Sequence, residues 1–225
     1  MSPCTCDYSG INCMKAKTTE SLQKAFGVGG PGEHRGLWIQ RTPVPSLPVG
    51  VFGKFKFVKA YIDLNKNLTS FSLEALANSK DTLEELSLFS NDLSRIDYDR
   101  TRIIALASLN PTDIQIDLGR IESIHPKAFE KTFPLELTLS YNDLTSFPKD
   151  VFHPIIIGAL QNVQKGLVSI LPKVLTRGNR FTCRGCDYKW LLPFASNTAM
   201  QRVFSDFSCE DGTRLYNLTS SVIGC

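Results

Sequence analysis

Residues 83–96 read LEELSLFSNDLSRI, and their apolar positions suit neither a helix nor an ordinary strand. The apolar residues Leu83, Leu86, Leu88, Leu93 and Ile96 are separated by steps of 3, 2, 5 and 3. An amphipathic helix repeats its apolar residues at i, i+3, i+4 and i+7, and a half-buried strand repeats them at every second residue. A short strand followed by an inward turn and an outer arc explains the mixture, so the stretch predicts one coil of a repeat.

The pattern L-x-L-x-x-N-x-L-x-x-I recurs along the chain, with more and less complete copies. In our alignment the second copy contains Ile62, Leu64, Asn67 and Phe71, with one residue missing after the asparagine. The polar landmarks of the five copies, separated by steps of 25, 24, 28 and 23, are Thr42, Asn67, Asn91, Gly119 and Asn142. Leucine-rich repeats have 20 to 29 residues per coil. The period therefore predicts an α/β-type solenoid of stacked coils, curved into a horseshoe with short parallel strands on its concave face and an irregular or short helical convex side.

The asparagines have a physical reason in such a coil. After the strand the chain turns inward, and main-chain N–H and C=O groups enter the core without a ladder partner. Asn91 and Asn142 carry both donors and acceptors on a short side chain. We therefore expect them to be buried and to satisfy these groups from within.

The residues that flank the paired apolar positions should face the concavity, because alternate side chains of a strand point to opposite sides. The predicted partner-binding residues are Trp38, Tyr61, Asp63, Glu85, Phe89, Asp113, Gln115, Asp117, Glu136 and Thr138. The same register adds Gly36, Gln40, Asn65, Ser87 and Ser140. These fifteen positions include five carboxylates and neither Lys nor Arg. They predict an acidic face with aromatic residues toward one end, suited to a protein partner that is basic at the contact; the alternative is an ordinary solvated surface.

The composition excludes several classes of protein. A net charge of +3 over 225 residues is too small for a nucleic-acid-binding protein. No apolar run approaches the roughly 20 residues that cross a bilayer, and the start MSPCTCDYSG shows no secretion signal. We therefore expect a globular chain with no membrane span and no nucleic-acid partner.

The seven cysteines lie at the two ends: Cys4, Cys6, Cys13, Cys183, Cys186, Cys209 and Cys225. Such clusters are typical of disulfide-linked caps around a central region. A zinc site is the alternative, with Cys183 and Cys186 as its first half. The second half would lack a C-x-x-C spacing, which favours disulfides and a secreted or extracellular protein.

No motif predicts catalysis, a cofactor or a metal. The run GVGGPG at 27–32 lacks the Lys and Ser/Thr of a phosphate-binding loop and is interpreted as a linker. His34, His125 and His153 have no metal-ligand spacing and are expected in exposed loops. Asn67 and Asn217 both begin N-glycosylation sequons. Asn217 is favoured, because Asn67 falls on a buried landmark in our alignment.

The sequence resembles the secreted leucine-rich repeat proteins with cysteine-rich caps. Cys4-x-Cys6 followed by Cys13 resembles their N-terminal cap, and NRFTCRGCDYKWLL at 179–192 resembles their C-terminal cap. The resemblance implies the disulfides Cys4–Cys13, Cys183–Cys209 and Cys186–Cys225. It also implies a cap and linker over 1–33, five or six repeats over 34–178, and a second cap over 179–225.

Three segments are most similar in sequence to arthropod proteins named after the non-catalytic subunit of Oplophorus-luciferin 2-monooxygenase: CRGCDYKWLL, DTLEELSLF and FGKFKFVKAYIDLNKNLTS. The resemblance implies a non-catalytic extracellular protein-binding scaffold or, alternatively, an accessory subunit of a secreted oxidoreductase or luciferase-like complex. Two departures stand out. A cysteine expected before Cys4 is absent, which either reflects a start upstream of this chain or leaves Cys6 as an odd thiol. The pattern also decays between Asn142 and Asn179, through a missing segment or an insertion, where Leu160, Leu167 and Ile170 are assigned to a weak coil.

Overall fold

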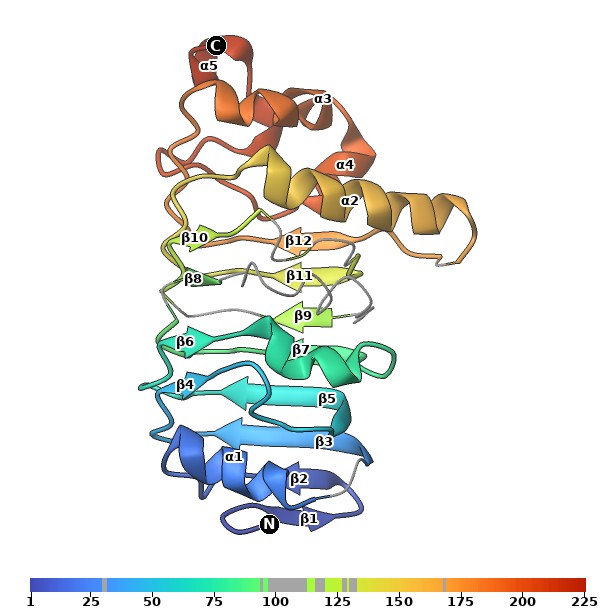
Figure 1. Ribbon diagram of the computed structural model, residues 1–225. Coiled ribbons are helices and arrows are strands. Elements are labelled where there is room, and N and C mark those ends of the chain that lie inside the picture. The colour runs from blue at the N-terminus through green and yellow to red at the C-terminus, as the bar shows by residue number, and fades with distance from the viewer. Residues whose placement is uncertain are drawn as a thin grey trace.

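A computed structural model describes residues 1–29, 32–93, 95–96, 113–115, 120–126, 129, 133–167 and 169–225, with positions 95, 96, 113 and 114 as backbone. A long sheet runs from the N-terminal end of the molecule to the helical segments at its C-terminal end (Figure 1). Its strands, in spatial order, are β1 (Thr5–Asp7), β2 (Gly10–Asn12), β3 (Glu33–Gln40), β5 (Lys56–Asp63), β7 (Glu85–Ser87), β9 (Asp113–Gln115), β11 (Glu136–Thr138) and β12 (Lys173–Leu175). The spatial order follows the chain order, as expected when each repeat adds one strand.

The strands of the long sheet pair in parallel from β2 to β12, and only the first pair, the hairpin β1–β2, is antiparallel. The register places one apolar residue of each strand in a continuous row: Leu37, Ala60, Leu86, Ile114, Leu137 and Val174. This confirms the predicted parallel sheet built from repeats. The curvature of the stack stays a prediction.

A second column of short strands lies beside the long sheet (Figure 1). It consists of the parallel pairs β4 (Ser46–Leu47) with β6 (Ser70–Phe71), and β8 (Arg95–Ile96) with β10 (Ser123–Ile124). Helical segments return the chain to the sheet, namely α1 (Thr19–Gly27), η1 (Leu73–Ser79) and α2 (Lys149–Gln164). Helix α1 was not predicted; its capping box at Thr18 and Ser21 is the local signal for it.

The asparagine of the opening stretch is buried and hydrogen-bonded as predicted. Asn91 is 4% exposed, and its Nδ2 donates to the carbonyl oxygens of Ile62 at 2.6 Å and Leu88 at 2.9 Å. Its Oδ1 accepts from the main-chain N–H of Asn65 at 3.0 Å. One side chain thus satisfies three main-chain groups of two coils, which links the coils through their turns.

Asn142 repeats part of this arrangement. Asn142 donates to the Leu139 carbonyl oxygen at 3.1 Å and accepts from the Ile121 N–H at 3.2 Å. Asn179 occupies the next turn, where it donates to the carbonyl oxygens of Leu139 and Thr176 at 2.8 Å each. The buried asparagines therefore form a ladder along the stack.

Five residues, each directly before a buried polar residue of an inner turn, adopt a left-handed backbone conformation. The positive φ angles belong to Arg41 (54°), Leu64 (59°), Ser90 (55°), Tyr141 (57°) and Gly178 (78°). The next residues are Thr42, Asn65, Asn91, Asn142 and Asn179. Because only the last of the five is glycine, the ladder hydrogen bonds outweigh a cost of about 1–2 kcal/mol for a non-glycine residue in this region.

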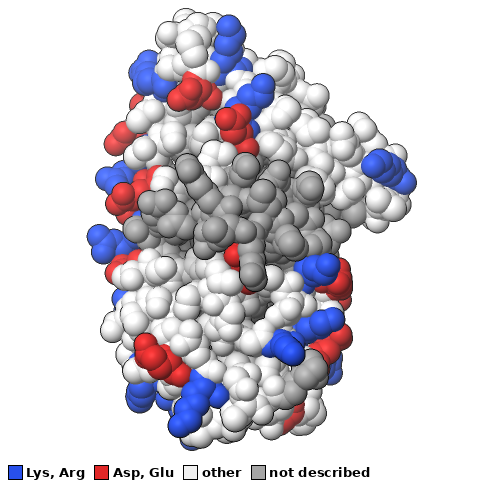
Figure 2. Space-filling view, viewed as in Figure 1, with Lys and Arg blue, Asp and Glu red and all other residues white. Residues whose placement is uncertain are grey.

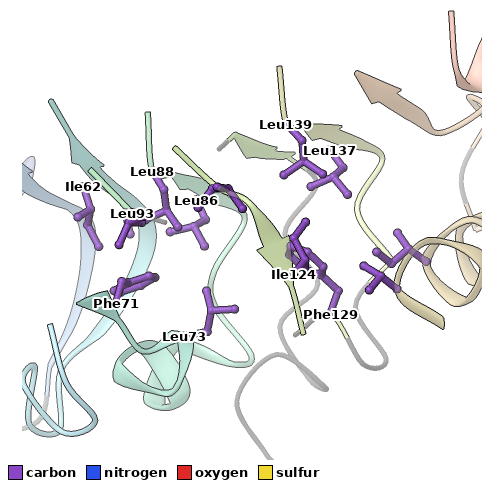
Figure 3. Packing of buried hydrophobic residues seen from close by; sticks show 14 of the residues in the cluster. Ile62, Phe71, Leu73, Leu86, Leu88, Leu93, Ile124, Phe129, Leu137 and Leu139 are labelled. Carbon is purple, nitrogen blue, oxygen red and sulfur yellow. The ribbon is translucent and has the colours of Figure 1, made fainter. Parts of the chain in front are cut away.

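The core lies between the two columns of strands. Figure 3 shows Leu86 and Leu88 of one coil and the corresponding Leu137 and Leu139 two coils further along the stack, with Phe71 and Phe129 from the outer arcs. All six are at most 4% exposed. Each such side chain contributes about 1.5–3 kcal/mol on burial, so the apolar positions of the repeat account for the stability of the stack.

The predicted weak coil between Asn142 and Asn179 is wrong. The 16-residue helix α2 occupies most of this segment and extends beyond the edge of the sheet (Figure 1). Only its first part packs inward, through Val151, Phe152, Ile155 and other residues, and the assigned core residues Leu167 and Ile170 are 71% and 57% exposed. An inserted helix, and not a degenerate repeat, lengthens the distance to the next asparagine.

The two ends carry disulfides. The first end has Cys4–Cys13, and the second has Cys183–Cys209 and Cys186–Cys225, which are the pairs implied by the family resemblance. Cys6 is free and exposed, 3.8 Å from Nδ1 of His34. The second end is helical, with η2 (Cys186–Leu191), α3 (Leu192–Ala195), α4 (Thr198–Val203), η3 (Leu215–Asn217) and α5 (Ser220–Ile223).

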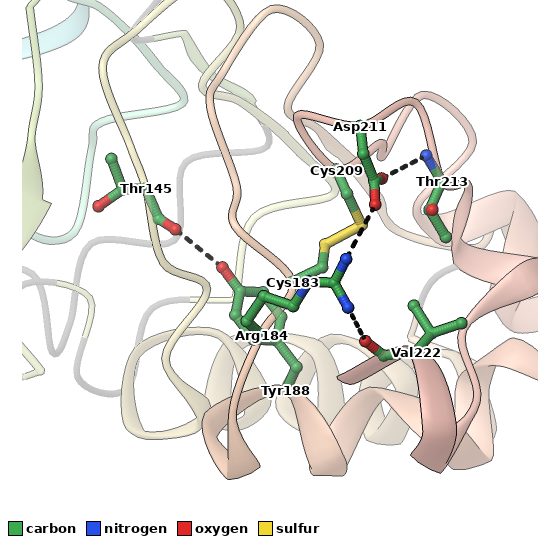
Figure 4. The surroundings of a disulfide bond; sticks show 8 residues. All are labelled: Thr145, Cys183, Arg184, Tyr188, Cys209, Asp211, Thr213 and Val222. Carbon is green, nitrogen blue, oxygen red and sulfur yellow. Dashed lines mark hydrogen bonds and ion pairs between the residues drawn. A yellow bond between two sulfur atoms is a disulfide. The ribbon is translucent and has the colours of Figure 1, made fainter. Parts of the chain in front are cut away.

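The second end is tied to the last repeats by hydrogen bonds as well as packing. The hydroxyl of Tyr188 donates to the Thr145 carbonyl oxygen of the last repeats at 2.8 Å (Figure 4). Within the second end itself, the Arg184 guanidinium donates to the Val222 carbonyl oxygen at 2.8 Å. Trp190 Nε1 donates to the Phe147 carbonyl oxygen at 3.0 Å. These contacts cover the apolar interior that the last coil would otherwise expose.

Candidate binding face

The outward side of the long sheet presents its side chains in rows. The register across the strands defines two of them, which we name the charged row and the middle row. The charged row is Gly36, Lys59, Glu85, Asp113, Glu136 and Lys173. The middle row is Trp38, Tyr61, Ser87, Gln115, Thr138 and Leu175. Seven of the ten predicted contact residues therefore share one face, as parallel strands require.

Our alignment of the second repeat was wrong by two residues. The structure pairs Leu37 with Ala60 and Ala60 with Leu86, so the inward pair is Ala60 and Ile62, and not Ile62 and Leu64. Asn65 is consequently the buried ladder residue, fully buried, with its Nδ2 donating to the Ile39 carbonyl oxygen at 2.8 Å. The error put Asn65 on the face and left Lys59 off it.

A sequence signal for the correct frame exists. Four ladder residues follow the second inward apolar residue by three positions: Thr42 follows Ile39, Asn65 follows Ile62, Asn91 follows Leu88, and Asn142 follows Leu139. The correct alignment was missed because the first inward residue of this repeat is Ala60, and a small side chain was not counted as an apolar position of the pattern. The two-residue error kept the inside and outside positions unchanged, since side chains alternate with a period of 2.

The prediction of a face without positive charge is wrong. Lys59 Nζ lies 2.9 Å from Glu85 Oε2, and Lys173 Nζ lies 3.6 Å from Glu136 Oε2. The hydrogen bond to Glu85 is the main cause that raises the pKa of Lys59. Figure 2 likewise shows blue and red side chains next to one another on the side it displays. Glu85 and Glu136 are each paired with a lysine on a neighbouring strand, so the charges of these two carboxylates are locally balanced.

Asp63 serves the structure of the face and not its exposed surface. It is 7% exposed, and its carboxylate accepts from the Ser87 hydroxyl at 2.6 Å, the Phe89 N–H at 3.0 Å and Gln40 Nε2 at 2.9 Å. These bonds join three neighbouring coils. A buried carboxylate with three donors is anchored, so its predicted role as a partner contact is wrong.

Trp38 and Tyr61 are partly exposed side chains on adjacent strands. Their ring centroids are 6.0 Å apart, and their planes differ by 20°. Burial, followed by the hydrogen bond to Glu85, raises the pKa of Tyr61. The phenol therefore stays protonated at neutral pH and keeps its bond to the charged row.

The remaining predicted contacts are placed as follows. Phe89 and Thr138 are partly exposed, and Gln115 is exposed. The side chain of Asp113 and all of Asp117 lie outside the described residues. Phe89 follows β7, and its N–H is held by Asp63, so its ring stands at the edge of the face beyond the middle row.

The histidines do not lie in exposed loops as predicted. His34 is in β3 with its ring stacked 5.5 Å from that of Phe55, and His153 is in α2 with its ring 5.8 Å from that of Trp190. His125 is partly buried as well. Among the described residues, no group of three His, Cys, Asp or Glu side chains is placed to hold a metal ion.

A hollow of about 500 Å³ lies where α2 begins beside η2, lined by Pro148, Lys149, Asp150, Asp187, Lys189 and Trp190. Its charges alternate in sign. It is separate from the outward face of the sheet and has no arrangement of groups typical of catalysis.

Both glycosylation sequons are accessible. Asn217 is exposed, and so is Asn67, because the ladder position belongs to Asn65. The reason for preferring Asn217 is therefore wrong, and modification of either asparagine stays a prediction.

The described coils, their asparagine ladder and the disulfides at both ends are features of a leucine-rich-repeat-like fold. Comparison with known proteins adds little to this class. No protein-family model and no curated protein matches the chain, so the naming after a luciferin monooxygenase subunit has no support from these comparisons. Among solved structures, human 5T4 (Wnt-activated inhibitory factor 1, trophoblast glycoprotein) is similar at 14% identity and a TM-score of 0.45, covering 100% of this chain and 99% of that chain. A likeness this distant carries no argument.

Proposed function

We propose that this protein is a non-catalytic scaffold that binds a protein partner through the outward face of its long sheet. The supporting observation is the register, which brings exposed and partly exposed residues from five strands onto one continuous surface. The proposed contacts are Trp38, Tyr61, Glu85, Phe89, Gln115, Glu136 and Thr138. Aromatic anchors surrounded by polar side chains are typical of protein interfaces.

The basic character of the partner stays a narrower proposal with weaker support. Glu85 and Glu136 are each paired with a lysine. Exposed pairs of this kind contribute only about 0–1 kcal/mol, so a partner's arginine could displace the lysine at small cost. We expect steering by charge to be modest.

We also propose an extracellular location. Three disulfides are typical of an oxidising compartment. Within the described residues, no helix has the length and apolarity needed to cross a bilayer.

A pair of matched variants tests the proposed protein-binding face. Thr138→Arg places a long charged side chain in the middle row, next to Gln115 of the neighbouring strand, whereas Thr145→Arg makes the same change at an exposed position off the long sheet. Proteins captured from extracellular fluid by the wild type and by each variant are compared by quantitative mass spectrometry. We expect a partner captured by the wild type to be lost with Thr138→Arg and retained with Thr145→Arg. Equal recovery with both variants would contradict the proposed face.

The accessory-subunit hypothesis differs only in the identity of the partner. The captured complex would then contain a catalytic chain with oxidoreductase activity. A captured partner without such activity would rule out this hypothesis and leave the scaffold proposal in place.

A further inference from the structure

The rings of Trp38 and Tyr61 lie flat on the sheet. A Cβ built on Gly36, two residues before Trp38 on the same side, would meet Cη2 of the indole first and Cζ2 and Cζ3 at 2.7 Å each. Equal distances this short to both neighbours of Cη2 mean that the Cβ would strike the face of the ring and not its edge. The indole therefore covers Gly36 with one face, and the glycine makes room for it.

The Tyr61 ring continues this surface. Its plane is within 20° of the indole plane, and its centroid is displaced by 6.0 Å toward the neighbouring strand. The two rings therefore lie nearly parallel to each other on neighbouring strands. Tyr61 also leans in the same direction as Trp38, since its hydroxyl bonds to Glu85 of the charged row. We name this pair the aromatic platform.

Polar groups border the aromatic platform on both sides. Lys59 Nζ and Glu85 Oε2, 2.9 Å apart, lie along one side, and Gln40, whose Nε2 donates to Asp63 Oδ2 at 2.9 Å, lies along the other. The Lys59–Glu85 pair carries no net charge. The arrangement combines a flat apolar surface with donors and acceptors at its edges.

We propose that the aromatic platform is a binding site for a neutral, β-linked oligosaccharide. The C–H bonds on one side of a pyranose ring carry partial positive charge and pack on the negative face of an aromatic ring. Two nearly parallel rings on neighbouring strands can hold two neighbouring sugar units, while Lys59, Glu85 and Gln40 can bond to the hydroxyls that project from the sugar edges. The site goes beyond the proposed protein partner and does not depend on it.

Other ligands that stack on aromatic rings fit this surface less well. A guanidinium or ammonium ion stacked on these rings would lie beside the like charge of Lys59. A nucleotide would need several cations for its phosphates. A proline-rich peptide uses a groove between upright aromatic rings, whereas these rings lie flat.

Isothermal titration calorimetry with cellohexaose, chitohexaose and maltohexaose tests the proposal. We expect a β-1,4-linked hexasaccharide, which is an extended ribbon, to bind at least about tenfold more tightly than the curved α-linked maltohexaose. Absence of binding by both β-linked sugars, or equal binding of maltohexaose, would overturn the proposal.

Variants locate the site. Trp38→Ala should weaken binding by about tenfold or more, and Trp38→Phe, which keeps a flat ring, by less. Gly36→Ala should also weaken binding, because the added Cβ lifts the indole from the sheet while both rings remain. Tyr8→Ala removes an aromatic ring that is 92% exposed on the first hairpin and should change nothing.

Thermal melting of each variant, compared with the wild type, separates loss of the site from loss of the fold. Sugar binding that survives Trp38→Ala in a folded protein would overturn the proposal. The protein-binding face is tested separately, by partner capture with Thr138→Arg. Absence of sugar binding therefore does not contradict the proposed protein-binding face, and absence of a protein partner does not contradict the proposed sugar site.

Discussion

The inner turns and the outward rows of the sheet both carry polar side chains, but these side chains do different work. Asn91 in an inner turn bonds to main-chain groups that have no other partner, and it is 4% exposed. Lys59 on the charged row bonds to one carboxylate that is itself partly exposed. The comparison teaches that a polar residue in this fold is structural when it replaces a missing main-chain bond, and available for binding when it does not.

The largest expected effect is at the ladder. Asn91→Ala removes the side chain that satisfies the Ile62 and Leu88 carbonyl oxygens and the Asn65 N–H, all of them buried. We expect the free energy of unfolding to fall by about 3 kcal/mol, measured by urea denaturation. Asn67→Ala, at an exposed asparagine of the preceding repeat, is the control and should change it by less than about 0.5 kcal/mol. Equal effects would remove the distinction between the two regions.

The next effect tests a residue of the face that behaves like a ladder residue. Asp63→Ala leaves the Ser87 hydroxyl and the Phe89 N–H without their acceptor. We expect a loss of about 2 kcal/mol in unfolding free energy. Asp81→Ala, at an exposed aspartate, serves as the control. A loss as small as that of the control would return Asp63 to the list of binding residues.

A smaller effect concerns the left-handed residue before each ladder position. Arg41 has φ of 54° and an exposed side chain. Glycine adopts this conformation without the steric cost that alanine retains, so Arg41→Gly should be more stable than Arg41→Ala by about 1 kcal/mol. Differential scanning calorimetry measures the difference. If alanine proved the more stable, the turn would impose no backbone requirement.

The smallest effect is expected at the charged row. Lys59→Met removes the ion pair with Glu85 but leaves both residues exposed to water, so stability should change by less than about 0.5 kcal/mol. Lys54→Met, at another exposed lysine, is the matched control. If urea denaturation showed that Lys59→Met alone lowers the free energy of unfolding by more than about 1 kcal/mol, the charged row would contribute to the stability of the fold.

The repeat was predictable because it follows from local periodicity. The spacing in LEELSLFSNDLSRI identifies the inward residues Leu86 and Leu88 and the buried Asn91 without knowledge of the fold, since each coil must bury its own apolar residues against the next. The frame failed in the second repeat, where Ala60 occupies an inward position and Leu64 lies in the turn. Apolar character alone could not choose between two frames that differ by an even number of residues.

The binding face was predictable in outline and wrong in charge. Tyr61 and Glu85 lie on the face as predicted, because the two-residue error in the alignment of the second repeat does not change which side chains point outward. Lys59 was recognised as a residue of the face only through its pairing with Glu85 in the structure. Asp63 could not be assigned from sequence, because its burial depends on donors from Ser87 and Gln40 in two other coils. Helix α2 was missed for a similar reason: an insertion has no counterpart in the repeat that predicts the rest.

The sequence by itself determined the coil, because the spacing of a few apolar residues and one amide specifies the strand, the inward turn and the outer arc. Only the tertiary structure decided which residues of neighbouring coils meet. The flat seat of Trp38 over Gly36, the nearly parallel ring of Tyr61 and the Lys59–Glu85 pair all arise between positions far apart in the chain. Stacking brings them together, because a strand gives each side chain a direction but only the register of the sheet gives it a neighbour.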